Sequence, residues 1–134
     1  MRLFRVLALV YAVPGVGWAV ATLAILLYHR DHGELPMTPF GWRLLGGPYP
    51  EIGVERLTPL GWALALLLVA VSIVDVMIGR WLWRGRPGGA VLALVMAPVS
   101  FTLGWLFALP YLLVMAPLRA IAAFVAWRDL RRSR

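Results

Sequence analysis

The chain has 134 residues, of which 62% are hydrophobic and only 14% are charged, and its net charge is +7. Soluble domains average about 45–50% apolar and about 25% charged residues, and a short soluble chain cannot hide this much apolar surface. The composition therefore excludes a soluble enzyme and indicates an integral membrane protein, while the absence of cysteine excludes thiolate and disulfide chemistry.

Apolar stretches in chain order predict four membrane spans. A helix needs about 20 apolar residues to cross the roughly 30 Å hydrocarbon core. The stretch 90–127 would be about 57 Å long as one helix, so we expect it to fold back near Pro110. The predicted fold is an all-α four-transmembrane-helix bundle, with residues 1–134 forming a single transmembrane domain. The expected spans are 6–28, 60–79, 90–108 and 111–127.

An alternative topology has only three spans. In this alternative, residues 117–132 lie along the membrane surface as an amphipathic helix. Ile121 and Phe124 would face the lipid, while Arg119 and Arg128 would face water.

Charge placement predicts the orientation of the bundle. Nine arginines fall on the side of both termini, against three arginines and four acidic residues on the other side. Because cytoplasmic loops carry the excess of basic residues, both termini are expected in the cytoplasm, in a multi-pass protein of the cell membrane. The first set is Arg2, Arg5, Arg80, Arg84, Arg86, Arg128, Arg131, Arg132 and Arg134; the second is Arg30, Arg43, Arg56, Asp31, Glu34, Glu51 and Glu55.

The basic residues also suggest a source and a partner. All 13 are arginine, and lysine, asparagine and glutamine do not occur. Codon bias in a GC-rich genome gives this pattern, which suggests a bacterial inner membrane. The arginine-rich cytoplasmic C-terminus, 128–134, should attract anionic headgroups at about 1 kcal/mol per basic residue. Nothing else in the chain favours a nucleic-acid partner.

The extracytoplasmic loop, 29–59, contains the first copy of a short sequence repeat. The sequence Thr-Pro-Phe-Gly-Trp at 38–42 recurs as Thr-Pro-Leu-Gly-Trp at 58–62. Threonine caps free N–H groups and proline suits the first helical position, so both copies are expected to start helices. The second copy starts the second span, and the first predicts a short interfacial helix over 39–45. The alternative is a duplicated binding element.

Asp75 is the most informative residue, because it lies inside the apolar part of the second span. A carboxylate there is costly unless it is paired, protonated or facing water. We expect Arg119 of the last span to be its partner. Ser72, Asp75 and Gly79 share one helical face, which suits a small-residue packing seam. Ser72, Ser100 and Thr102 are expected to complete a polar intramembrane cluster. The alternatives are a solute or proton pathway, and Asp75 simply reaching toward Arg80 or Arg84.

A weaker cluster lies at the outer end of the first span. His29 and His32 would share a helical face, and nitrogen and oxygen ligands of this kind suit zinc or another divalent metal. The alternative is a set of ordinary hydrated interface residues. The candidate ligands are His29, His32, Glu34, Glu51 and Glu55.

A helix kink is expected within the first span, at Pro14, Gly15 and Gly17. Proline removes a backbone hydrogen bond and glycine loosens the helix. Broken helices line substrate sites in some transporters, which is the functional alternative.

Three functions remain open. The chain has no nucleophile–base arrangement, no phosphate loop and no expected cofactor. The first hypothesis is therefore a non-catalytic protein, either an accessory subunit of a membrane complex or a self-associating scaffold. The second is a small transporter or channel that uses Asp75 and Arg119. The third is a membrane enzyme acting on a lipid or quinone, which would use the histidine cluster.

Overall fold

The computed structural model describes residues 2–41 and 43–132, which form four helices. Each helix is long and apolar enough to cross a membrane, so the architecture is that of an all-helical, multi-pass membrane protein. The helices are α1 (Arg2–His32), α2 (Pro59–Trp83), α3 (Pro87–Leu106) and α4 (Pro110–Arg132).

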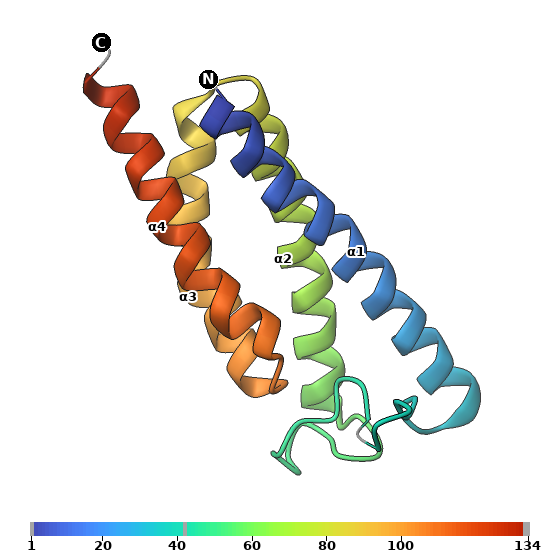
Figure 1. Ribbon diagram of the computed structural model, residues 1–134. Coiled ribbons are helices and arrows are strands. Elements are labelled where there is room, and N and C mark those ends of the chain that lie inside the picture. The colour runs from blue at the N-terminus through green and yellow to red at the C-terminus, as the bar shows by residue number, and fades with distance from the viewer. Residues whose placement is uncertain (1, 42, 133–134) are drawn as a thin grey trace.

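The helices form two antiparallel hairpins (Figure 1). α1 packs mainly on α2 and α3 packs mainly on α4, while α2 and α3 join the hairpins and α1 meets α4 only briefly. In the part of the chain that is described, α2 and α4 make no close backbone approach, so they lie diagonally opposite. Figure 1 shows the long loop and the α3–α4 turn at one end, here called the loop end, and both chain termini at the other, here called the terminal end.

Proline lies at the starts of α2, α3 and α4, and a threonine caps α2. The Thr58 hydroxyl accepts a hydrogen bond from the Gly61 N–H at 3.1 Å, and Pro59 occupies the first turn of α2, as expected for a capped start. The last apolar stretch folds back between Leu106 and Pro110, where Ala108 takes a left-handed φ of 49°. α4 then continues unbroken through Pro117, so residues 117–132 belong to one long helix and are not a separate surface segment.

The core divides into two apolar clusters. The cluster at the loop end is built largely of leucine, isoleucine and phenylalanine from the helices and the loop, whereas the cluster at the terminal end contains five alanines. The first comprises Ile25, Leu26, Leu35, Leu45, Ile52, Leu57, Ala65, Leu68, Val71, Leu103, Phe107 and Leu112. The second comprises Leu7, Ala8, Tyr11, Ile78, Leu82, Ala90, Ala93, Ala123 and Ala126.

The first copy of the sequence repeat, at 38–42, does not start a helix. Within 39–45, the described residues form turns and an isolated bridge between Met37 and Arg43, in place of the short helix expected there. Gly41 and Leu45 have φ values of 91° and 59°, which an α-helix does not accept. Trp42 lies outside the described residues. The expectation of a helix over 39–45 is therefore corrected to a turn.

Candidate functional site

A buried ion pair joins the two hairpins across the bundle. Arg119 Nη1 of α4 donates to Asp75 Oδ2 of α2 at 3.3 Å. Asp75 is 6% exposed and Arg119 is 4% exposed. Because α2 and α4 are diagonally opposite, the long arginine side chain spans a distance that the backbones do not close. The pair lies between the two apolar clusters and links α2 of one hairpin to α4 of the other.

Tyr11 of α1 forms the third side of this site. The guanidinium carbon of Arg119 lies 4.6 Å from the centroid of the Tyr11 ring, which is a cation–π contact. Such contacts contribute about 2 kcal/mol when they are desolvated. Tyr11 was not among the residues predicted from the sequence. A tyrosine well inside an apolar span was the available signal, since its polar tip usually has a partner when buried.

Two glycines allow α1 to approach α2 beside this pair. A Cβ atom on Gly15 would lie 2.8 Å from the Ser72 carbonyl oxygen and 3.1 Å from Asp75 Cβ. One on Gly79 would lie 2.7 Å from the Ala8 carbonyl oxygen. Small residues at a helix crossing permit this closeness in lipid, where packing drives association. The helix that carries Tyr11 is thereby brought against the face that carries Asp75.

The ion pair borders a small, partly open cavity. Its volume is about 10 Å³, and its lining includes Tyr11, Asp75, Ser100 and Arg119. Arg119 Nε is buried and makes no hydrogen bond within the described structure. A cavity needs about 10–15 Å³ to hold one water molecule, so this one has room for a single water at most. It is too small for a solute.

The other predicted members of the polar cluster are distributed unevenly. Ser100 lines the same cavity as the ion pair. Ser72 is buried one turn away, where its hydroxyl donates to the Leu68 carbonyl at 2.8 Å. Thr102 is exposed and donates to the Pro98 carbonyl of its own helix at 2.8 Å, so it faces away from the cluster.

The candidate metal ligands are not brought together. Nε2 of His29 accepts the Leu57 N–H at 3.1 Å, and the ring stands edge-on to Trp62. His32 stacks on Tyr28 with ring centroids 4.0 Å apart. Across the described residues, no group of three or more histidine, cysteine or acidic side chains is placed to hold a metal ion.

The acidic members of this metal set lie in the loop. Glu34 pairs with Arg43 at 3.5 Å. Glu51 and Glu55 are exposed, and their backbone carbonyls accept bonds from the Thr58 hydroxyl and the Leu35 N–H. His29 thus ties the loop to the end of α1, and the Glu51 carbonyl ties it to the start of α2, while His32 stays against its own helix.

Helix α1 is continuous through the predicted kink residues. Pro14 lies inside the helix, Gly15 is buried at the α2 crossing, and a Cβ on Gly17 would meet no atom within 4 Å. Pro98, which was not predicted as a helix-interior proline, lies within α3.

The chemistry available to the site follows from its geometry. The carboxylate and the guanidinium are paired, the tyrosine ring covers the arginine, and the cavity beside them has a volume of about 10 Å³. Within the described chain, the only titratable groups with both charge and deep burial are Asp75 and Arg119. No protein-family model, curated protein or solved structure matches the chain.

Proposed function

We propose that this chain is a structural membrane protein, either an accessory subunit of a larger membrane complex or a self-associating scaffold. The observation that carries the proposal is the closed Asp75–Arg119 pair. Its two residues are 6% and 4% exposed and face a cavity of about 10 Å³. A buried charged pair beside so small a cavity favours a role in fixing how the helices dock over a role in passing a solute.

A small transporter or channel is the second candidate. It is favoured by one feature, the unpartnered Nε of Arg119 beside a cavity that reaches Ser100. A proton pathway through this point would need water to enter from both ends. A membrane enzyme acting on a lipid or quinone draws less support, because His29 and His32 are engaged with Leu57, Trp62 and Tyr28.

Self-association and transport can be separated with the purified protein. The scaffold proposal expects more than one chain, or a stoichiometric partner subunit, in each particle in mild detergent, as measured by native mass spectrometry. It also expects proteoliposomes to show no proton flux that depends on Asp75. A monomer whose proton flux is abolished by Asp75→Asn and retained by Glu55→Gln would overturn the proposal in favour of the transporter.

We further propose that the chain works as one transmembrane domain in a bacterial inner membrane, with both termini in the cytoplasm. The excess of arginine at the terminal end supports this orientation, and that end would contact anionic headgroups. Ser133 and Arg134 lie outside the described residues. The chain is free of cysteine, so single cysteines report on the orientation directly.

Two positions suit this labelling experiment. Glu55 is exposed in the loop, and a Cβ on Gly88 beside the α2–α3 turn would meet only ordinary contacts at 3.6 Å. In intact cells, Glu55→Cys should react with an impermeant maleimide, and Gly88→Cys should react only after permeabilisation. The reverse pattern would contradict the orientation. Equal labelling of both from outside would contradict the single span, α2, that separates the two positions.

A further inference from the structure

A cleft opens at the terminal end, between the start of α1, the α2–α3 turn and the end of α4. Its volume is about 560 Å³, within the range of about 300–1,000 Å³ that is usual for small-molecule sites. It exists because α1 and α4 meet only briefly, and Figure 1 shows the end of α4 leaning away from the start of α1. The lining residues are Leu3, Phe4, Arg5, Leu82, Trp83, Arg84, Gly85, Asp129 and Leu130.

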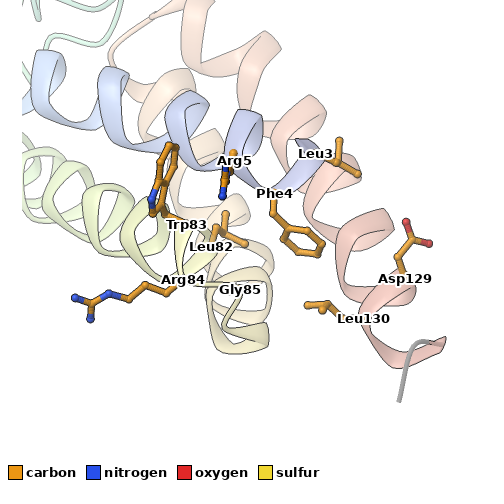
Figure 2. Close-up of a pocket in the computed structure, with 9 residues that line it drawn as sticks. All are labelled: Leu3, Phe4, Arg5, Leu82, Trp83, Arg84, Gly85, Asp129 and Leu130. Atoms are coloured by element: carbon orange, nitrogen blue, oxygen red, sulfur yellow. The ribbon is translucent and has the colours of Figure 1, made fainter. Parts of the chain in front are cut away.

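The interior of this cleft is apolar. Figure 2 shows Phe4 projecting from α1 into the space, with Leu130 of α4 facing it. Leu82 is fully buried and lies beside Phe4 at the α2 side of the space. A groove of this character between transmembrane helices suits a hydrocarbon chain, because it offers apolar contacts along its length.

The rim carries a positive charge that has no acidic partner. The guanidinium of Arg5 lies 5.6 Å from the centroid of the Trp83 ring, which positions it beside the cleft. None of the ion pairs among the described residues involves Arg5. Arg84 extends away from the cleft in Figure 2, toward the outside of the bundle. Arg5 is therefore the group placed to bind an anion at this site.

The surroundings of the cleft are also basic. Eight described arginines lie at the terminal end of the helices, against one acidic residue, Asp129. An arginine forms strong charge-assisted bonds with phosphate, and basic pockets between transmembrane helices bind lipid headgroups. These arginines are Arg2, Arg5, Arg80, Arg84, Arg86, Arg128, Arg131 and Arg132.

We propose that this cleft is a binding site for one anionic phospholipid. Arg5 holds the phosphate, Trp83 holds Arg5 in place, and an acyl chain lies over Phe4 and Leu130. Asp129 at the α4 side of the rim weakens binding of the phospholipid, because its carboxylate repels the phosphate. The site is distinct from the Asp75–Arg119 pair and does not depend on it.

Native mass spectrometry of the purified full chain tests the proposal. The probes are phosphatidylglycerol and phosphatidylcholine with identical acyl chains, added at equal concentrations. We expect one phosphatidylglycerol adduct per chain to outlast the phosphatidylcholine adduct. Because one basic residue near a headgroup is worth about 1 kcal/mol, Arg5→Gln should weaken the phosphatidylglycerol adduct about fivefold. Asp129→Asn should strengthen it by a similar factor.

Two further variants keep the test decisive. Arg56→Gln removes the same charge from the exposed loop and should leave the adduct unchanged. Leu3→Trp narrows the cleft without changing its charge and should weaken the adducts of both lipids. Because Leu3 is half-exposed, this variant should fold, and it tests the site even if Arg5→Gln does not fold. Equal retention of the two lipids by the unmodified chain, or equal losses in Arg5→Gln and Arg56→Gln, would overturn the proposal.

Discussion

The two ends of this bundle are built differently although the same four helices reach both. At the loop end, residues 33–58 fold back over the helices and insert Leu35 and Leu45, which are 0% and 3% exposed, beside Phe107 of the α3–α4 turn. At the terminal end, the core is rich in alanine and a cleft of about 560 Å³ stays open between α1 and α4. Large side chains fill the loop end, whereas the terminal end is held by helices that approach one another closely at small residues.

The buried ion pair lies at the border between these two regions. Bulky residues of the loop and helices pack on one side of it, and an alanine-rich cluster lies on the other side. Small residues constrain helix rotation less than interlocked side chains do. We therefore propose that the directional contact between Asp75 and Arg119 fixes α4 against α2.

A substitution at Phe107 should give the largest difference in stability between the two ends. Phe107→Ala removes a ring that is 2% exposed and should lower the free energy of unfolding by about 3–5 kcal/mol. The matched change at the other end is Phe4→Ala, on the floor of the cleft, which should cost less than half as much. Steric-trapping or thermal unfolding in detergent measures both. Equal losses would show that the two ends are packed alike.

The close approach of α1 and α2 gives the next largest effect. Gly79→Val places a side chain against the Ala8 carbonyl and Ala12, and should cost about 1–3 kcal/mol through forced separation of the helices. Gly17→Val is the control, because a Cβ there would meet nothing within 4 Å. Unfolding measurements that give the same loss for both variants would contradict a tight crossing at Gly79.

The attachment of the loop to α1 gives a smaller effect. His29→Ala leaves the Leu57 N–H without its acceptor, which should cost about 1 kcal/mol and increase hydrogen exchange at Leu57. His32→Ala, whose ring is exposed and stacked on Tyr28, is the control and should leave that exchange unchanged. An unchanged exchange rate at Leu57 in His29→Ala would contradict the hydrogen bond between the Leu57 N–H and His29.

Much of the fold could be predicted from the sequence, because the membrane imposes simple constraints on length and polarity. The helix starts at Pro59 and Pro110 follow from local backbone chemistry. A contact between Asp75 and Arg119 was also predictable, since a charge in an apolar span needs a partner. The spans follow from segment length, the helix starts follow from proline, and the contact follows from the cost of an unpaired charge in an apolar span.

Features that depend on helix rotation or on distant segments could not be predicted. Tyr11 contacts Arg119 only because α1 turns that face inward at Gly15. The two copies of Thr-Pro-x-Gly-Trp behave differently because only the second is followed by a long apolar stretch; the first closes into a turn at Gly41. Thr102 lies two residues from Ser100, which places it on another face of α3. The five candidate metal ligands lie apart because His29 bonds to Leu57 of the loop and His32 stacks on Tyr28 of its own helix.

A double-mutant cycle on Asp75 and Arg119 tests the central claim most directly. Removing one partner strands a buried charge, so Asp75→Leu and Arg119→Leu should each destabilise the solubilised protein by about 3–5 kcal/mol. The double variant should recover part of this loss, with a coupling energy of about 0.5–3 kcal/mol. Losses that simply add would contradict a structural ion pair between α2 and α4.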